Sequence, residues 1–459
     1  MNDTLRSIVR HWCEPDNGVH SIAEILDWIR QCNAEAAVEI RKISLPDCAP
    51  WFYDRSEGCI RNQARSFFTI TGCKGPGFQQ PIILQEEIGY LGIICQEFDG
   101  VMHFLMQTKI EPGNINRVQI SPTIQATKSN FTQKHGGQKP PYLEYFLDAE
   151  KYEIVVDQIQ SEQSSRFYKK RNRNIILRVN ENIHLFPSHR WMTLGQIKRL
   201  MREDNLVNTD TRTVLSCIPF SRLRLSSAEL QELAGLFLNK PLFYSLFVGE
   251  EENHLPQIYQ YINNQKMFIE ESPVLVPLDR LENWEMRDGE FRCKHPYPFK
   301  VVFCDVAIRG REVWRWTQPL LEATGIATFG LICCEDRGLL KFLVRATREV
   351  GCFDVMELGP TVQREAAPMC RLEENALDKL FNEHLQSGEG ILFDHLLSEE
   401  GGRFYHEQNR NVLLCVSQEE LPPLPNGYFL LDYRTLNELV QVNNTLNIQL
   451  RNLLSLLEA

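Results

Sequence analysis

Residues 80–125 have the sequence QPIILQEEIGYLGIICQEFDGVMHFLMQTKIEPGNINRVQISPTIQ, and residues 318–363 have the sequence QPLLEATGIATFGLICCEDRGLLKFLVRATREVGCFDVMELGPTVQ. The two stretches align without a gap at an offset of 238 (318 − 80 = 238), and fifteen of their 46 positions are identical. A second pair follows at an offset of 237, namely SEQSSRFYKKRNRN (161–174) and SEEGGRFYHEQNRN (398–411). Paired anchors in the same order predict that one structural unit occurs twice in the chain.

These repeats divide the chain into segments. Its 459 residues suffice for two to four domains of ordinary size. In both repeats, short β-rich runs such as YLGIIC and FGLICC are bounded by Gly, Pro and Asn, and a helical stretch follows them. The pattern predicts an α+β fold in which a mixed sheet flanked by helices occurs in two copies. We expect helices over 1–37, the first repeat over 38–216, a helical connector over 217–271 and the second repeat over 272–459.

The composition argues against several classes of function. The formal net charge is −11 and hydrophobic residues make up 43%, so the chain has material for cores but no basic character. We therefore expect no nucleic-acid partner. The N-terminal sequence MNDTLRSIVRHWCEPD does not resemble a signal peptide, and no apolar run approaches the ~18 residues of a membrane span. With fourteen scattered cysteines, we expect a cytoplasmic protein with reduced thiols and no membrane partner.

Sequence motifs for cofactors and metals are absent. The chain contains no GxGxxG that opens a helix after a strand, no GxxxxGK[ST] and no GxSxG. It also lacks HExxH and CxxC, and we expect His184 and His189, in a loop-like segment, to lie at the surface. We expect no metal and no cofactor, so that any catalysis would come from side chains acting on an activated substrate.

Three polar stretches of the first repeat adjoin apolar strands. QTKIEPGNIN (107–116) places Lys109, Glu111 and Asn114 around a Pro-Gly turn. QISPTIQATKSN (119–130) alternates in the manner of a strand, and KHGGQKPPYLEYF (134–146) carries one His and two Tyr beside glycines. Two interpretations stay open, a solvated face or a wet ligand cleft whose amides and hydroxyls bind sugar hydroxyls. The candidates in the last two stretches are Gln119, Ser121, Thr123, Gln125, His135, Tyr142 and Tyr145.

The second repeat keeps the scaffold of these stretches but not their polar residues. EPGN becomes EVGC, QATKSN becomes QREAAP, and KHGGQKPPY has no counterpart. This asymmetry favours chemistry in the first repeat. RFYxxxNRN precedes an apolar strand in both repeats, which predicts a turn at a sheet end, where functional residues often lie.

The stretches EIGYLG, GVMHFLMQTKIEPGNINRVQISPTIQATKSN, SEQSSRFYKKRNRN and VNTDTRTVLSCIPF resemble the signatures of NDP-hexose 2,3-dehydratases over nearly the whole chain. The resemblance implies two Nudix-like units per chain and a homodimer. The sequence lacks the Nudix box, so metal-dependent pyrophosphohydrolase activity is not expected. The family acts on dTDP-4-keto-6-deoxyglucose and gives a 3,4-diketo-2,6-dideoxy sugar nucleotide, which a 3-ketoreductase or aminotransferase uses next. The alternative is a tandem Nudix-like module that binds a nucleotide without catalysis; the retained EPGN and SPTIQATKSN favour the enzyme.

This reaction implies a base near C3, a donor to O4 and an acid for the departing C2 hydroxyl. We assign Glu111 or His135 as the base or acid, and Lys109 or Tyr145 as the donor to the developing oxyanion. Each has a structural alternative: Glu111 orders the turn, His135 belongs to a mobile loop, Lys109 pairs with Glu111, and Tyr145 packs in a core.

The nucleotide part of such a substrate implies cations and an aromatic surface. Arg166 and Arg173 are the phosphate candidates, because a planar guanidinium fits phosphate oxygens; the alternative is that they hold the turn through backbone carbonyls. Their counterparts Arg403 and Arg410 leave two alternatives, a second nucleotide pocket that still binds or a vestigial one. The thymine candidates are Tyr168, Trp191 and Tyr142, and the polar substrate-binding candidates are Asn114, Gln119, Ser121, Thr123 and Gln125.

Overall fold

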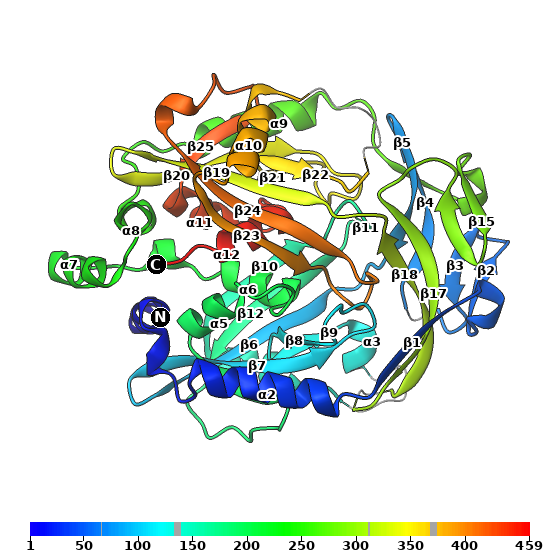
Figure 1. The fold of residues 1–459 in the computed structure, drawn as a ribbon, viewed down its shortest axis with the longest axis horizontal. Coiled ribbons are helices and arrows are strands. Elements are labelled where there is room, and N and C mark those ends of the chain that lie inside the picture. The colour runs from blue at the N-terminus through cyan, green and yellow to red at the C-terminus, as the bar shows by residue number, and fades with distance from the viewer. Residues whose placement is uncertain (66, 133–138, 311–312, 368–373) are drawn as a thin grey trace.

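The computed structural model describes residues 1–65, 67–132, 139–310, 313–367 and 374–459 (Figure 1). Within these ranges the strands form four sheets, two of seven strands, one of six and one of five, with helices packed around and between them. The predicted α+β class with mixed sheets is confirmed. No helix in the described ranges is both long and apolar enough to cross a membrane.

The two seven-stranded sheets have the same strand order. The first runs β10-β12-β6-β7-β13 with β8 beside β7 and β9 beside β6; the other runs β23-β24-β19-β20-β25 with β21 beside β20 and β22 beside β19. Both are mixed, because β12 lies parallel to β6 and β24 parallel to β19. The strands are β6 (Gly89–Phe98), β7 (Val101–Ile110), β8 (Val118–Ser121), β9 (Ile124–Ala126), β10 (Glu153–Ser161), β12 (Arg171–Arg178), β13 (His189–Met192), β19 (Thr328–Asp336), β20 (Leu339–Thr347), β21 (Glu357–Pro360), β22 (Val362–Arg364), β23 (Ile391–Ser398), β24 (Gln408–Val416) and β25 (Tyr428–Asp432).

A two-residue turn sets the register of each central hairpin. Asp99 and Gly100 join β6 to β7 with φ of 51° and 82°, and Arg337 and Gly338 join β19 to β20 with φ of 51° and 78°. Two successive positive φ values are the property of the type I′ turn, whose twist matches that of a hairpin. The turn pairs Phe98 with Val101. It thereby fixes which polar side chains emerge at the far end of β7.

The two smaller sheets exchange their first strands. The six-stranded sheet contains β2 (Trp51–Asp54), β3 (Cys59–Asn62), β4 (Thr69–Gly75), β5 (Phe78–Leu84) and β11 (Phe167–Tyr168), and β14 (Val274–Val276) joins it at β4. The five-stranded sheet contains β15 (Trp284–Arg287), β16 (Glu290–Cys293), β17 (Phe299–Ile308) and β18 (Arg315–Ala323), and β1 (Val38–Ile43) joins it along β17 (Figure 1). The strand that begins each expected repeat therefore pairs with the sheet of the other.

Two helices connect the large sheets. α6 (Thr209–Ser216) and α12 (Ile448–Ser455) contact each other, and one hydrophobic core contains residues of both sheets. Arg212 on α6 donates from Nη2 to the Ser398 carbonyl at 2.6 Å, and Arg451 on α12 donates from Nη2 to the Ser161 carbonyl at 2.5 Å. Each buried guanidinium thus crosses to the turn of the other half.

The other helices cover the ends and outer faces of the sheets. Their bounds are α1 (Asn2–Cys13), α2 (Ile22–Glu35), α3 (Lys128–Phe131), α4 (Leu143–Leu147), α5 (Leu194–Leu200), α7 (Ser227–Leu236), α8 (Lys240–Phe247), α9 (Leu255–Met267), α10 (Ala376–Ser387) and α11 (Tyr433–Val440). Residues 1–37 and 217–271 are mainly helical.

Candidate functional site

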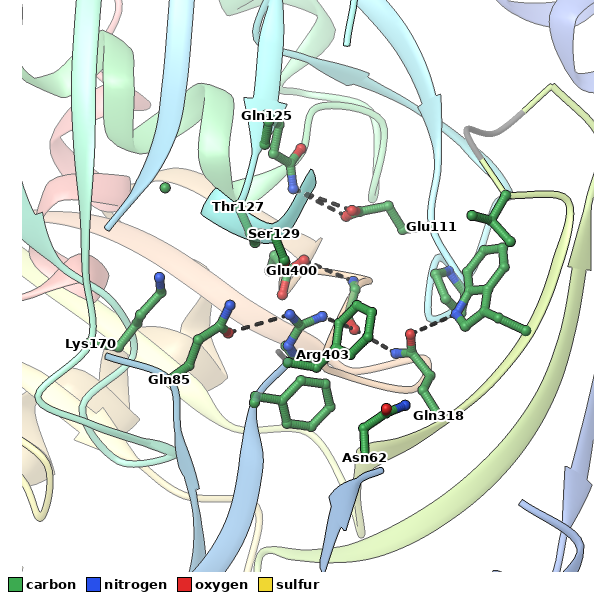
Figure 2. A pocket seen from close by; sticks show the side chains of 18 of the residues that line it. Asn62, Gln85, Glu111, Gln125, Thr127, Ser129, Lys170, Gln318, Glu400 and Arg403 are labelled. Carbon is green, nitrogen blue, oxygen red and sulfur yellow. Dashed lines mark hydrogen bonds between the residues drawn. The ribbon is translucent and has the colours of Figure 1, made fainter. Parts of the chain in front are cut away.

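A cavity of about 660 Å³ lies between the two halves of the chain (Figure 2). The first half contributes the ends of β3, β5 and β7, the start of β6, strand β9, the turn before β12, and α6. The second half contributes Gln318 and its neighbours on β18, together with Glu400, Gly402 and Arg403 from the loop between β23 and β24. The cavity is therefore a composite of both halves.

The floor of the cavity carries an amine beside a carboxylate. Lys109 Nζ lies 3.4 Å from Glu111 Oε1 and donates to the Gln125 carbonyl at 3.0 Å. Gln125 Nε2 in turn donates to both oxygens of Glu111 at 3.3 Å, and Figure 2 shows the two side chains facing each other. Because Lys109 and Glu111 flank the end of β7 and Gln125 lies on β9, the sheet itself sets the orientation of this carboxylate.

Besides Asp305, which pairs with Arg315, three further carboxyl groups line the same cavity. They are Glu162 in the turn after β10, Asp210 on α6 and Glu400 from the second half. Burial, with the nearby charge of Glu111, raises the pKa of Glu400 to about 8. Burial also raises the pKa of Glu162, and it raises that of Asp210 well above its usual range. Closely spaced buried carboxyl groups cannot all ionise, so the site holds protons at neutral pH.

The opposite wall is cationic and aromatic. Arg403 Nη2 donates to Gln85 Oε1 at 3.3 Å, and its guanidinium lies 4.2 Å from the centre of the Phe68 ring (Figure 2). Lys170 is buried and donates from Nζ to the Glu87 carbonyl. Burial lowers the pKa of Lys170 to about 8, although the charges of Glu162 and Glu87 oppose this shift. The aromatic side chains that line the cavity are Trp51, Phe67, Phe68, Tyr90, Phe167 and Trp316.

The structure brings three predicted residues together at the cavity, Lys109, Glu111 and Gln125. Four other predicted polar residues bind neighbouring chain segments instead. Asn114 Nδ2 donates to the Arg117 carbonyl at 2.8 Å, Gln119 Nε2 to Ser398 Oγ at 2.8 Å, and Thr123 Oγ1 accepts from the Ile94 amide at 2.9 Å. Ser121 Oγ accepts from Asn208 Nδ2 at 2.8 Å. The predicted alternation is interrupted at Pro122, because β8 pairs with β7 whereas β9 pairs with β6.

The predicted aromatic residues lie away from the cavity. Tyr142 donates from its hydroxyl to the His184 carbonyl at 2.8 Å, and Trp191 packs edge-on against Phe98 with ring centres 5.1 Å apart. Tyr145 packs beside Tyr152, and burial together with the Glu181 charge raises its pKa to about 12. Tyr168 lies beneath Lys169, 5.3 Å from the amine to the ring centre.

The three histidines named from the sequence have different outcomes. His135 lies outside the described residues. The expectation that His189 lies at the surface is wrong: it is buried on β13, where Nε2 is 3.2 Å from the Thr123 carbonyl, and burial lowers its pKa to about 4. His184 is exposed, as expected.

The four predicted arginines take different positions. Arg166 is buried, forms a bidentate ion pair with Glu365 of the second half at 2.7 Å, and lies 4.4 Å from the centre of the Phe299 ring. Arg173 pairs with Asp157 at 2.6 Å, and Arg410 makes the equivalent pair with Asp394 at 2.6 Å. Arg403, predicted for a second pocket, instead lines the cavity described above.

Sequence reasoning did not select Glu162, Lys170, Asp210 or Glu400 as site residues. A comparison of the repeats contained a signal for two of them. Lys170 aligns with Glu407, and Asp210 within NLVNTDTRTVLS (205–216) aligns with Gln449 within NTLNIQLRNLLS (444–455). At both positions an ionisable residue of the first repeat aligns with a residue of different charge in the second repeat, within an otherwise matched stretch. Nothing in the sequence indicates that Glu400 crosses to the first half.

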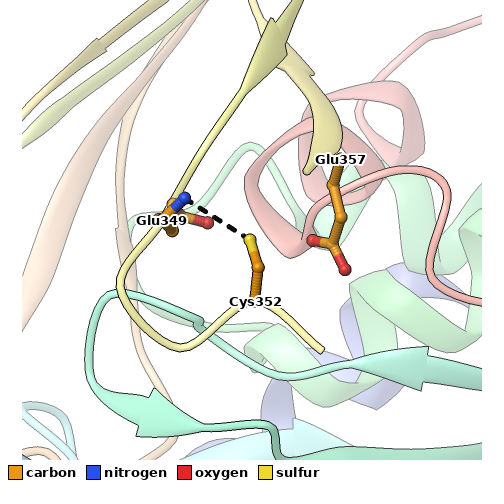
Figure 3. A group of neighbouring side chains, drawn as sticks. All are labelled: Glu349, Cys352 and Glu357. Carbon is orange, nitrogen blue, oxygen red and sulfur yellow. Dashed lines mark hydrogen bonds between the residues drawn. The ribbon is translucent and has the colours of Figure 1, made fainter. Parts of the chain in front are cut away.

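The second half has its own acidic cluster at the positions that match Glu111, Asn114 and Gln119. Glu349, Cys352 and Glu357 place their ligand atoms within 4.8 Å of one another (Figure 3). Burial raises the pKa of Glu349 to about 8 and that of Glu357 to about 7, so both hold protons near neutrality. The charges of Arg166 and Arg451, which partly offset these shifts, face the cluster and oppose the binding of a cation there.

The chain is similar to known proteins over most of its length. The family model for NDP-hexose 2,3-dehydratase matches residues 22–218 and 255–457. A dTDP-4-dehydro-6-deoxy-alpha-D-glucopyranose 2,3-dehydratase of Saccharopolyspora spinosa is 36% identical over 453 residues, covering 96% of this chain and 92% of that protein. Proteins of the same name from Streptomyces violaceoruber and Amycolatopsis orientalis are 34% and 32% identical, covering 93% and 95% of this chain and 95% and 90% of theirs. The chain therefore belongs to the NDP-hexose 2,3-dehydratase family.

Proposed function

We propose that the protein removes water across C2 and C3 of dTDP-4-keto-6-deoxyglucose and releases a 3,4-diketo-2,6-dideoxy sugar nucleotide. The observation that carries this proposal is the cluster of Lys109, Glu111 and three carboxyl groups with raised pKa values in one cavity of a family member. The reaction needs proton transfers at adjacent carbons and no net oxidation. A site made of positioned acids, bases and one amine supplies that chemistry.

Glu111 is the base that removes the C3 proton. The 4-ketone acidifies this proton, and the resulting enolate places its charge on O4. Lys109 donates to O4, because it is the amine held beside Glu111 by the Gln125 carbonyl. A positioned donor to an oxyanion contributes on the order of 10²–10³-fold. The enolate then expels the C2 hydroxyl as water, and the enol that remains becomes the C3 ketone.

The nucleotide lies against the opposite wall. Arg403 and Lys170 bind the diphosphate, since both are cations that line the cavity and the Gln85 amide orients Arg403. The thymine ring packs on the aromatic side chains of that wall. Arg166 has a separate role in this proposal, because its buried pair with Glu365 joins the halves.

The fold and assembly that the resemblance implied are part of the same proposal. Each half is a Nudix-like unit, which is supported by the common strand order of the two large sheets and by a family model that matches two segments. The enzyme forms a homodimer and works in the cytoplasm, where its cysteines stay reduced; the described cysteines all carry free thiols. A 3-ketoreductase or an aminotransferase consumes the product.

The test is to incubate the purified chain with dTDP-4-keto-6-deoxyglucose and a 3-ketoreductase that traps the labile diketone. We expect a 2-deoxy sugar nucleotide, with one deuterium at C2 when the reaction is run in D₂O. Glu111→Gln is the negative control, and binding of dTDP is measured in parallel by calorimetry. Nucleotide binding without any 2-deoxy product would reject the enzyme and favour the non-catalytic binding module.

A further inference from the structure

The steps above provide no role for Glu162, Asp210 and Glu400, and of these three carboxyl groups Asp210 is the one with neither oxygen hydrogen-bonded among the described residues. It lies in the first turn of α6, it is 1% exposed, and it borders the cavity. Neither Oδ1 nor Oδ2 has a hydrogen-bond partner among the described residues. A buried carboxylate without donors is costly, whereas a buried carboxylic acid keeps a proton to donate.

The charges around Asp210 also favour the protonated form. Glu111 approaches from β7, Glu162 from the turn after β10 and Glu400 from the loop of the second half, and all three raise its pKa. Lys109 acts in the opposite direction. Arg212, on the same helix, directs Nη2 to the Ser398 carbonyl. The helix dipole favours an anion only weakly, and Asn208 already caps this turn, so burial and three carboxyl neighbours dominate.

The second half shows that this carboxyl group is not needed for the helix. α6 and α12 share the capping residue, Asn208 or Asn447, and the crossing guanidinium, Arg212 or Arg451. Between these matched residues, Asp210 is replaced by Gln449. The scaffold thus tolerates an amide at this position, and the acid occurs in the half that contributes Lys109 and Glu111 to the cavity.

We propose that Asp210 is a catalytic acid that donates its proton to the C2 hydroxyl as that group leaves. This inference rests on the proposed function and adds the proton donor to it. The Asp210 O–H bond breaks, a proton is added to O2, and the C2–O bond breaks as the enolate electron pair forms the C2–C3 double bond. When the enol becomes a ketone, C2 gains a proton and O3 loses one. Glu111 and Asp210 thereby return to their starting states without a co-reactant.

The test separates enolate formation from loss of water. Asp210→Asn keeps the shape of the side chain but has no acidic proton. We expect its rate of water loss to fall by about 10²-fold or more, the lower range of acid–base contributions, while substrate recovered from D₂O gains deuterium at C3. Glu111→Gln should lose both C3 exchange and water loss. Glu357→Gln, which removes a buried carboxyl group outside the cavity, should keep the wild-type rate.

A second substrate makes the result independent of damage to the fold. Fluoride leaves without first accepting a proton, so Asp210→Asn should release fluoride from the 2-deoxy-2-fluoro analogue within about threefold of the wild-type rate. Three outcomes would overturn the proposal: Asp210→Asn that dehydrates normally, Asp210→Asn that loses C3 exchange, or equal losses with the fluoro and hydroxyl substrates. Failure of the wild-type enzyme to dehydrate would instead reject the proposed function.

Discussion

The turn at 161–174 and the turn at 398–411 share RFYxxxNRN and are held in the same reciprocal way, yet they face different surroundings. Gly113 of the first half donates its amide to the Gly401 carbonyl at 2.7 Å, and Gly351 of the second half donates to the Ser164 carbonyl at 2.7 Å. Arg403 thereby reaches the cavity beside Gln85, whereas Arg166 enters an ion pair with Glu365. Matched backbone contacts have been kept while the side chains around the two arginines have diverged.

The comparison shows where the chemical difference between the halves lies. Glu111 has the counterpart Glu349, but Lys109 becomes Thr347 and Lys170 becomes Glu407. The second half therefore keeps a carboxyl group and loses the amines that stabilise negative charge. It still contributes Glu400 and Arg403 to the lining of the cavity. The half that lacks these amines therefore completes the cavity of the half that has them.

We expect the largest difference between matched residues of the two halves at the two glutamates, Glu111 and Glu349. Glu111→Gln should lower kcat by about 10²–10⁴-fold and leave KM nearly unchanged, because an amide cannot remove the C3 proton. Glu349→Gln, in the cluster of Figure 3, should keep the wild-type kcat. Steady-state kinetics with the trapping reductase measure both. A similar loss in both variants would place catalysis in the second half as well.

The two matched arginines should separate stability from binding. Arg166→Ala leaves Glu365 without its partner and should lower the free energy of unfolding by about 3–5 kcal/mol, which denaturant titration measures. Arg403→Ala should instead weaken dTDP binding about 10–100-fold, because a hydrogen bond from a charged donor contributes about 1.5–3 kcal/mol. If instead dTDP binding were weakened only in Arg166→Ala, the nucleotide site would have to be assigned to the surroundings of Arg166 in place of the cavity.

Substitutions of the matched glycines Gly113 and Gly351 test the close contacts that each makes with the turn of the other half. A Cβ on Gly113 would lie 1.5 Å from the Phe404 carbonyl oxygen, and one on Gly351 would lie 1.8 Å from the Phe167 carbonyl oxygen. Each Gly→Ala change should cost about 3 kcal/mol of stability, the upper end of ordinary overpacking, because backbone must move. Gly235→Ala, with nothing within 4 Å of the added atom, is the control. Tm values close to wild type in all three would contradict the close approach.

The smallest effect concerns pH. Burial lowers the pKa of Lys170 to about 8, so the amine is protonated below that pH and neutral above it. The affinity for dTDP should therefore fall up to roughly tenfold between pH 7 and pH 9, since one charged hydrogen bond is lost. Lys170→Gln should weaken binding at pH 7 and remove this dependence. Lys169→Gln, whose side chain is exposed, should keep it.

Parts of this picture follow from local sequence and parts do not. The paired β-rich runs predict the strands of a mixed sheet in both halves, and the polar residues around Pro112 lead to Lys109 and Glu111. Pro122 breaks the alternation that was expected to align Gln119, Ser121 and Thr123 with Gln125. Glu400 and Arg403 could not be assigned to this cavity from the sequence. The local sequence of the turn at 398–411 is the same whether the turn packs against its own half or against the other half.

The exchange of β1 and β14 bears on whether either repeat could be lost during evolution. Because β1 completes the sheet of the second half and β14 that of the first, a chain shortened to one repeat would lack a strand of its own sheet and would carry one made for another. The second half therefore cannot be removed from the chain without taking a strand from the sheet of the first half, however much its side chains differ. The duplicated region is free to change its chemistry and is retained by its topology.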